Sequence, residues 1–179
     1  MDHSDDHRIF LTADTHFGHR RLVEEHRARP EFKTIKEMDE CIIERWNAAV
    51  RPCDTVLHLG DFAFGNACYY ASKLNGHIHL VKGNHDHRTR DLHKTKIAVA
   101  PDSVCVVKIN DTKVVLCHYP MLSWPARGHG SLHFFGHVHS RNRLVGQRNN
   151  SYDVGVDNNN FTPVDFLTAT ALCQTTQAG

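Results

Sequence analysis

The first hundred residues alternate between short apolar runs and segments whose apolar positions repeat every three or four residues. The apolar runs are rich in β-branched and aliphatic residues and predict buried strands at residues 8–14, 55–61 and 77–86. Helices are predicted between them, at residues 19–28, 35–50 and 67–74. The strongest helical segment is 35–50, which carries one apolar stripe made of Ile35, Met38, Ile42, Trp46 and Ala49. This order predicts βαβ units, in which parallel strands place their carboxyl ends along one edge of the sheet.

The pattern changes after Pro101. Residues 103–111 and 112–120 predict a hairpin that turns at Asn110 and Asp111. Further strands are predicted at residues 131–140, 151–157 and 165–172. Since no long helix is expected beyond residue 100, the second half of the chain is predicted to be mostly β.

Length and composition fit one domain over residues 1–179, with flexible ends at residues 1–7 and 174–179. The net charge of +1 gives no electrostatic case for nucleic acid or a membrane surface as a partner. No apolar run approaches the roughly 20 residues of a membrane span, and the polar start has no signal-peptide core, so a cytoplasmic protein is expected. The six cysteines contain no Cys-x-x-Cys pair and are expected to be reduced thiols; the oligomeric state is left open.

Metal-ligand side chains follow the predicted strands. They occur in five short segments and are Asp14 and His16; Asp61; Asn84, with His85 and Asp86; His118; and His137 and His139. Two of these pairs are spaced two residues apart, so in an extended strand both side chains of a pair would point to the same face. Glycine beside the ligands, at Gly60, Gly83 and Gly136, would let the backbone turn sharply.

Each segment alone has an ordinary structural interpretation as a polar turn or a hydrogen-bonded histidine. Their joint occurrence at strand ends favours a metal site. The candidate ligands are too many for one ion: Asp14, His16, Asp61, Asn84, His118, His137 and His139. Two divalent ions sharing a carboxylate fit better. The imidazole and carboxylate donors suit Mn first, with Fe, Zn or Ni as alternatives. Two such ions with two aspartates leave a charge of about +2, which favours an anion such as phosphate.

The segments DTHFGH, LGDF, GNHD, CHYP and GHVHS resemble, in order, the five sequence blocks of the calcineurin-like metallophosphoesterases. The match spans about residues 9–157, and the short chain resembles the small single-domain bacterial and phage members. The resemblance implies an α/β fold, a four-layer α/β/β/α sandwich, with a dinuclear centre. It implies one ion held by Asp14, His16, Asp61 and His139, and a second held by Asp61, Asn84, His118 and His137.

The same resemblance leaves His85 free of metal and predicts it to be catalytic, with Asp86 as a second catalytic residue whose pairing with His85 is open. Two ions would make a water acidic enough to act as a hydroxide nucleophile, and a protonated His85 would stabilise charge or protonate the leaving oxygen. Phe64 and Gly65 stand where the protein phosphatase branch has an Asp and a phosphate-binding Arg. Phosphodiesters (a cyclic nucleotide, a dinucleotide or a nucleic acid end) are therefore favoured over a phosphoprotein.

Four residues are predicted to contact substrate: His19, Arg20, Trp124 and Arg127. The last two lie in the loop 121–131, where packing within the loop is an equal alternative. Residues 140–143 could add to a modest basic rim. The expected partner is a small phosphorylated substrate or nucleotide; nucleic acid is not indicated by the charge, and no membrane is expected. Two rival interpretations stay open, a mononuclear hydrolase and a non-catalytic metal-binding scaffold or interaction protein of the same fold.

Overall fold

The computed structural model describes residues 7–26, 28–89, 91–139 and 150–175. The termini predicted to be flexible lie mostly outside these residues, and the predicted basic rim at 140–143 lies wholly outside them. Within the described ranges, every helix is too short or too polar to span a bilayer.

The first sheet contains the strands predicted in the first hundred residues. Its order is β4 (Ala98–Val99), β3 (His77–Leu80), β2 (Thr55–His58), β1 (Ile9–Thr12) and β9 (Val164–Asp165). Strands β1 to β4 pair in parallel, and β9 is antiparallel to β1. The predicted βαβ order is thus confirmed, and the carboxyl ends of β1, β2 and β3 meet at one edge of the sheet.

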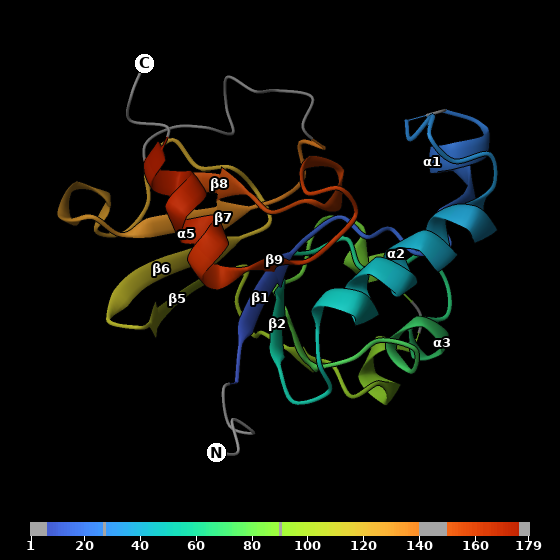
Figure 1. The fold of residues 1–179 in the computed structure, drawn as a ribbon, viewed down its shortest axis with the longest axis horizontal. Coiled ribbons are helices and arrows are strands. Elements are labelled where there is room, and N and C mark those ends of the chain that lie inside the picture. Colours follow the sequence, from blue (N-terminus) through green and yellow to red (C-terminus); the bar gives the residue numbers. More distant parts are fainter. Residues whose placement is uncertain (1–6, 27, 90, 140–149, 176–179) are drawn as a thin grey trace.

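Three helices belong to the first half of the chain: α1 (Arg20–Glu24), α2 (Ile35–Ala49) and α3 (Ala67–Ala71). Helix α2 begins where the side chain of Thr34 accepts the backbone N–H of Glu37, an N-cap that satisfies one free donor of the first turn. Its predicted stripe buries Met38, Ile42 and Trp46 against the first sheet. The stripe therefore explains why α2 lies along this sheet (Figure 1).

The second sheet has the order β5 (Val104–Ile109), β6 (Thr112–Cys117), β7 (Leu132–Phe135) and β8 (Ser151–Asp153). Strands β5 and β6 form the predicted antiparallel hairpin. Asn110 and Asp111 both have positive φ, 46° and 64°, as a tight two-residue hairpin turn requires. Strands β6, β7 and β8 are parallel, so their carboxyl ends also share one edge.

The prediction of a strand at residues 165–172 is wrong. Residues Phe166–Thr175 form helix α5, and only Val164–Asp165 is extended. The Asp165 side chain accepts the backbone N–H of Leu167, which favours the start of a helix there. Phe166, Ala169 and Cys173 are buried at intervals of three and four residues, so the apolar pattern had the helical period.

The space between the two sheets forms a continuous apolar core. Side chains of both sheets and of α5 contribute to it, among them Leu11, Leu59, Leu116, Phe134, Phe166 and Ala169. The rings of Phe134 in β7 and Phe166 in α5 lie 6.1 Å apart. Helices α1 to α3 flank one sheet and α5 packs against residues of both, which confirms the predicted α/β sandwich (Figure 1).

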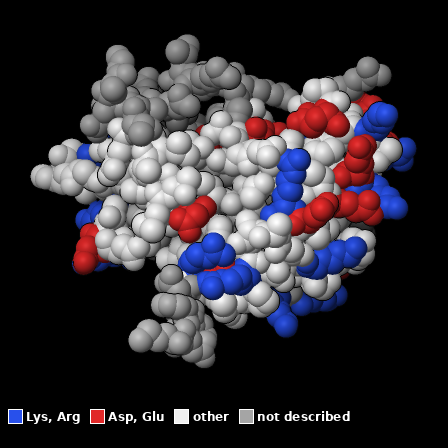
Figure 2. Space-filling view, in the orientation of Figure 1, with Lys and Arg blue, Asp and Glu red and all other residues white. Residues whose placement is uncertain are grey.

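Charged residues are interspersed on the surface. Figure 2 shows acidic and basic side chains side by side on one face of the molecule. Several pair along helices at a spacing of four residues, such as Arg21 with Glu25 on α1 and Lys36 with Glu40 on α2. The six cysteines are all free thiols, as predicted.

The packing of α5 generates a first prediction. Phe166→Ala should lower the free energy of unfolding by about 3–5 kcal/mol, because Phe166 is only 4% exposed and its loss leaves a cavity in the core between the sheets. The adjacent Leu167 is 65% exposed, so Leu167→Ala should change it by less than about 0.5 kcal/mol. Urea unfolding of both variants measures the difference, and equal losses would contradict the orientation of α5.

Candidate metal centre

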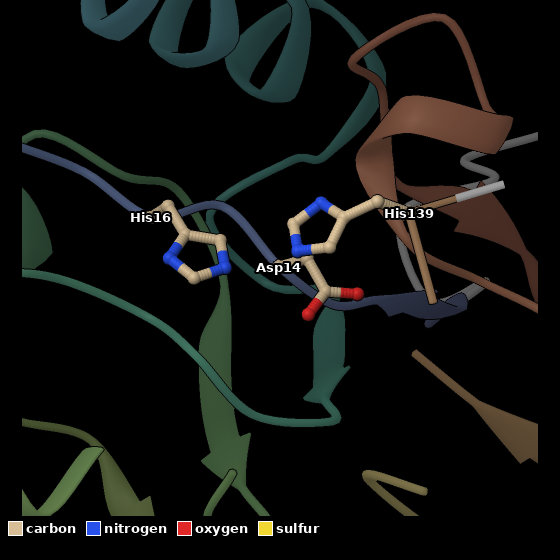
Figure 3. Close-up of side chains that lie close together, drawn as sticks. All are labelled: Asp14, His16 and His139. Atoms are coloured by element: carbon tan, nitrogen blue, oxygen red, sulfur yellow. The ribbon is translucent and has the colours of Figure 1, made fainter. Parts of the chain in front are cut away.

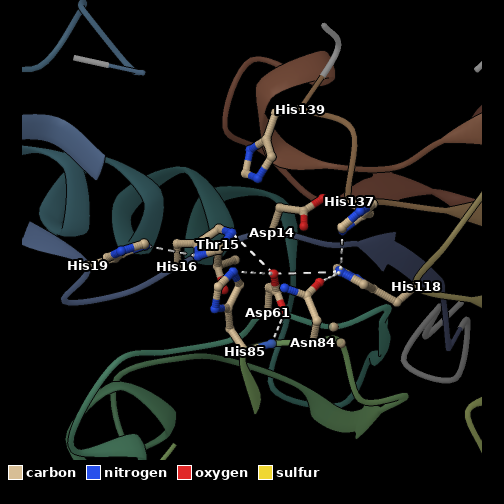
Figure 4. Close-up of polar contacts among 12 residues, drawn as sticks. Asp14, Thr15, His16, His19, Asp61, Asn84, His85, His118, His137 and His139 are labelled. Atoms are coloured by element: carbon tan, nitrogen blue, oxygen red, sulfur yellow. Dashed lines mark hydrogen bonds and ion pairs between the residues drawn. The ribbon is translucent and has the colours of Figure 1, made fainter. Parts of the chain in front are cut away.

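The five predicted segments meet where the two sheets join. Beyond β1 and β2, the N–H of Asp14 donates to the carbonyl of Gly60 (2.9 Å) and the N–H of His16 to that of Asp61 (2.9 Å). In the second sheet the N–H of Gly136 donates to the carbonyl of His118 (3.0 Å). All seven predicted ligands, together with His85, consequently surround one region (Figure 4).

The backbone at these ligands is turned, not extended. Five of them have positive φ: Asp14 (58°), His16 (50°), Asp61 (58°), His137 (73°) and His139 (49°). The prediction that each two-residue pair shares a face of an extended strand is therefore wrong. Asp and His tolerate this left-handed conformation better than most residues, and its cost of about 1–3 kcal/mol per residue is typical of functional sites.

Two of the glycines are required by close approach. A Cβ on Gly136 would lie 2.5 Å from Oδ2 of Asp14, and one on Gly83 would lie 2.8 Å from the backbone N of Asp61. Any side chain at either position would displace a carboxylate-bearing turn. The sequence prediction that glycine removes bulk beside the ligands is confirmed at these two positions.

One group of donors consists of Asp14, His16 and His139. A donor atom from each lies within 4.8 Å of the others, and both imidazoles lie around the Asp14 carboxylate (Figure 3). Asp14 is fully buried, and this burial raises the pKa of its carboxyl well above its usual range. Burial also lowers the pKa of His16, which keeps that imidazole neutral. A neutral imidazole beside a buried carboxylate is a fitting donor set for a divalent cation.

A second group consists of Asp14, Asp61 and His118, again with donor atoms within 4.8 Å of one another. The His118 Nδ1 lies 2.8 Å from the carbonyl of Leu59, so it must be the protonated nitrogen. Its Nε2 lone pair then faces Oδ1 of Asn84 at 3.0 Å and lies 3.6 Å from Oδ2 of Asp61. A cation would satisfy these converging acceptors. His137 lies beside them, with its Nδ1 3.2 Å from Nε2 of His118.

Unpaired buried atoms support the same assignment. Among the described residues, three of the six buried side-chain polar atoms without a hydrogen-bond partner lie here: Asp14 Oδ1, His16 Nε2 and His85 Nδ1. An unpaired buried polar atom costs about 1–3 kcal/mol, so such a cluster indicates donors kept for a ligand. Imidazole, carboxylate and amide donors together fit divalent metal binding.

His85 lies beside this cluster. Its backbone N–H donates to Oδ1 of Asp61 (2.8 Å), which fixes the turn that carries it. Its Nε2 is 3.9 Å from Oδ2 of Asp61, and its side chain is 34% exposed. The rings of His16 and Phe64 lie 5.5 and 5.1 Å away. His85 is thus placed to reach a substrate at the cluster while the predicted ligands lie behind it.

The catalytic role predicted for Asp86 requires correction. Its carboxylate is buried and accepts backbone N–H groups from Asp61 (2.7 Å), Phe62 (2.9 Å) and Gly83 (2.7 Å). The ring nitrogen of His85 that it could have oriented, Nδ1, has no hydrogen-bond partner. Asp86 therefore holds together the turns that carry Asp61 and Asn84.

Of the four predicted substrate residues, only His19 reaches the centre. It stacks on Phe64, with ring centroids 3.7 Å apart, and its Nδ1 lies 3.3 Å from Nδ1 of His16. Burial lowers the pKa of His19 to about 4, so it is neutral at pH 7. Arg20 is exposed and engages Glu24 on the surface of α1.

Trp124 and Arg127 pack within their own loop. Trp124 is buried and donates its Nε1–H to the carbonyl of Ser131 (3.2 Å). The Arg127 guanidinium lies 4.9 Å from the centroid of the Trp124 ring and donates to the carbonyl of Leu122 (2.8 Å). These contacts favour the loop-packing alternative over the predicted substrate role.

Two residues that support the centre were missed in the sequence. Asp157 accepts a hydrogen bond from Nδ1 of His139 (2.8 Å), and its other partner is Arg29, whose side chain is 1% exposed. Burial tends to raise the pKa of Asp157, but the hydrogen bonds to His139 and Arg29 outweigh this and hold the pKa well below its usual range. The residue pattern predicts no catalytic or metal-binding role for the segment that contains Asp157. Arg29 follows α1 at no spacing typical of a functional residue, so the sequence alone does not identify either residue.

Comparison with known proteins shows which chains share this fold. No family model matches the chain. It is 29% identical over 168 residues to the uncharacterized protein MJ1445 of Methanocaldococcus jannaschii, which covers 89% of this chain and 87% of that protein. The protein of unknown function AQ665 from Aquifex aeolicus superposes with a TM-score of 0.70 at 23% identity, over 89% of this chain and 96% of that one. The two chains share a fold.

More distant solved structures include an archaeal phosphodiesterase and a zinc-complexed Vps29 from Entamoeba histolytica. The first has a TM-score of 0.41 at 18% identity, over 83% of this chain and 82% of that one. The second has a TM-score of 0.42 at 17% identity, over 82% and 72%. In the order of its motifs and in their placement at strand ends, the chain resembles the calcineurin-like metallophosphoesterases.

The contacts of Asp86 generate a second prediction. Asp86→Asn should lower the free energy of unfolding by about 1–3 kcal/mol and weaken metal binding, because the amide keeps only one of the two oxygens that accept three N–H groups and loses the negative charge. His85→Ala should leave both nearly unchanged. Urea unfolding and metal titration measure these effects. A slowed Asp86→Asn enzyme with normal stability and metal binding would instead restore the predicted catalytic role.

The buried donors generate a third prediction. Mn²⁺ at a hundred times its dissociation constant should raise the free energy of unfolding by about 2.7 kcal/mol per ion bound. Asp61→Asn should lose most of this gain, since Asp61 faces His16 and His118 at once. Asp54→Asn, which removes a buried carboxylate paired with Arg51 and Arg8 instead, should keep the gain. Equal gains in wild type and Asp61→Asn would contradict the assignment.

Proposed function

We propose that the chain is a metal-dependent phosphoesterase that hydrolyses phosphodiesters in preference to phosphoproteins. One observation carries the proposal: seven metal-ligand side chains from five distant segments surround one region, and a histidine outside that set, His85, lies at its edge. A structural metal site needs no such neighbour.

Two divalent ions are proposed, with Mn²⁺ as the first candidate. Asp14, His16 and His139 would contribute to one position, and Asn84, His118 and His137 to the other, with Asp61 between them. Ions bound here would supply positive charge for phosphate oxygens and a water acidic enough to ionise near neutral pH. Histidine and asparagine ligands add no negative charge, so the two ions would keep a net positive charge and the site favours an anionic substrate.

His85 is the proposed catalytic residue. Its backbone N–H is held by Asp61, which fixes the turn that carries it, and its ring lies 5.5 Å from that of His16 without being bound among the ligands. Its Nε2 lies 3.9 Å from the Asp61 carboxylate, between the two proposed ion positions. A proton on Nε2 would therefore lie near the leaving oxygen of a phosphoester bound at the ions. Proton transfer from a positioned side chain contributes about 10²–10⁴-fold to a rate.

The preference for diesters rests on the surroundings of His85. Phe64 lies 5.1 Å from it and stacks on the neutral His19, so this wall is aromatic. A Cβ on Gly65 would meet nothing within 4 Å, so this position faces open space. A dianionic monoester gains most from a bidentate arginine, whereas a monoanionic diester with a bulky ester group tolerates an apolar wall.

The test compares two substrates on protein loaded with Mn²⁺: bis-p-nitrophenyl phosphate, a diester, and p-nitrophenyl phosphate, a monoester. The diester should be cleaved faster. His85→Ala should slow its cleavage by about 10²–10⁴-fold while the metal content stays unchanged. His87→Ala, two positions along and exposed, is the matched control and should keep wild-type activity.

The outcomes separate the rival functions. Faster cleavage of the monoester would overturn the diester preference alone. Protein that binds two ions and cleaves neither compound would favour the non-catalytic scaffold. Activity with one ion per chain would favour the mononuclear hydrolase.

A further inference from the structure

We propose that Arg29 is a positioning residue that acts through Asp157 on His139, and that it sets mainly the affinity of one of the two metal positions. The inference rests on the metal centre of the proposed function. It concerns metal affinity, so it can be judged whether or not the chain cleaves a phosphoester.

Arg29 uses all five of its N–H donors. Nε and Nη2 bind the two oxygens of Asp157 as a fork, both at 2.8 Å. Nη2 also donates to the carbonyl of Asp14 (2.5 Å), and Nη1 donates to the carbonyl of Thr15 and to Sδ of Met38, both at 3.2 Å. Only a planar guanidinium offers this set, because a lysine has three donors and no fork.

The contacts continue from Asp157 to a metal ligand. Oδ2 of Asp157, held by Arg29, lies 2.8 Å from Nδ1 of His139. A carboxylate in this position fixes the proton on Nδ1, which leaves the Nε2 lone pair for the group formed with Asp14 and His16. His139 also has positive φ, so it does not lie in an extended strand, and the hydrogen bond to Asp157 orients its ring.

Arg29 fixes a second member of the same group through the backbone. The carbonyls of Asp14 and Thr15 that it binds belong to the left-handed turn following β1. One buried side chain therefore ties the turn that carries Asp14 to the residue that orients His139, across 128 positions of sequence. Such a link couples the first sheet to the segment that follows β8.

The other donor group shares Asp14 with the first, but the ligands that belong to it alone are held by other contacts. Nδ1 of His118 donates to the carbonyl of Leu59, and Asn84 follows a turn held by Asp86 through Gly83. Within the part of the chain that the structure describes, the hydrogen bonds of Arg29 do not reach His118, Asn84 or His137. Loss of the Arg29–Asp157 pair acts through His139, which belongs to one donor group alone, so it should weaken one ion more than the other.

The alternative is that this pair only stabilises the fold. The chain supplies a matched comparison, because Asp54 is likewise a buried carboxylate bound by arginines, Arg8 and Arg51, next to β2 and without a contact to the ligands. Asp157→Asn and Asp54→Asn remove equal charge from carboxylates that are 13% and 0% exposed, although the arginines that bind Asp54 are partly exposed and Arg29 is buried. A purely structural role predicts similar results for both.

The experiment titrates full-length metal-free protein with Mn²⁺ and follows heat and the number of ions bound. Wild type should bind two ions. Asp157→Asn and Arg29→Lys should each bind one ion about 10–100-fold more weakly and should weaken the binding of the other ion much less. His139→Ala should lose the same ion and His118→Ala the other one, while Asp54→Asn should bind both normally. Circular dichroism confirms that each variant is folded, and Arg29→Lys keeps the test valid if Asp157→Asn does not fold.

Three results would overturn the inference: unchanged affinities in both variants, equal weakening of both ions, or fewer than two ions in the wild type. Equal behaviour of Asp54→Asn and Asp157→Asn would also overturn it. Protein that shows the expected loss of one ion but cleaves neither phosphoester would overturn the proposed function alone.

Discussion

The structure around the site depends on carboxylates that are taken out of water without a full set of partners. Asp14 is completely buried, and one of its oxygens has no hydrogen-bond partner. A buried charge is tolerated only when it is paired, bound to a metal or neutralised by a shifted pKa. Burial lowers the pKa of the neighbouring imidazoles of His16 and His118, which disfavours their pairing with it as cations; at His139 the effect of burial is outweighed by the hydrogen bond to Asp157 and the charge of Asp14, which raise the pKa. A divalent cation is the partner that all of these groups have in common.

The backbone around the carboxylates is shaped by the same constraint. Ligands from opposite sheets can surround one point only if the chain turns sharply after each strand, which accounts for the positive φ of Asp14, Asp61 and His137. Gly83 and Gly136 remove the side chains that would collide with the turned carboxylates. Asp86 and Arg29 then bind the backbone of these turns from behind. The strain is therefore held by buried hydrogen bonds around the ligands.

This division of roles explains why adjacent residues differ so much in function. Asn84, His85 and Asp86 follow one another, yet the first faces His118, the second lies beside the centre, and the third binds backbone N–H groups. A turn points successive side chains in different directions, and here each direction meets a different environment. The aromatic wall of Phe64 and His19 completes the side of the centre on which His85 lies.

The amino-acid pattern by itself determined the strands and the main helix of the first half, the hairpin, and the choice of the seven candidate donors. These features follow from local periods and from residue chemistry, which do not depend on distant contacts. It failed at residues 166–175, where a helix with a buried stripe of Phe166, Ala169 and Cys173 was mistaken for a strand. An apolar run of that length fits either period until the neighbouring sheets define which side is buried.

Only the tertiary structure decided how the donors meet and what supports them. The left-handed turns at the ligands depend on hydrogen bonds between chain segments, so no local pattern reveals them. The role of Asp86 in binding backbone N–H groups, and the link from Arg29 through Asp157 to His139, join residues up to 128 positions apart. The packing of Trp124 and Arg127 within their loop was likewise undecided until their contacts were known. Ligand chemistry is carried by single residues, whereas orientation arises from contacts that exist only in the folded chain.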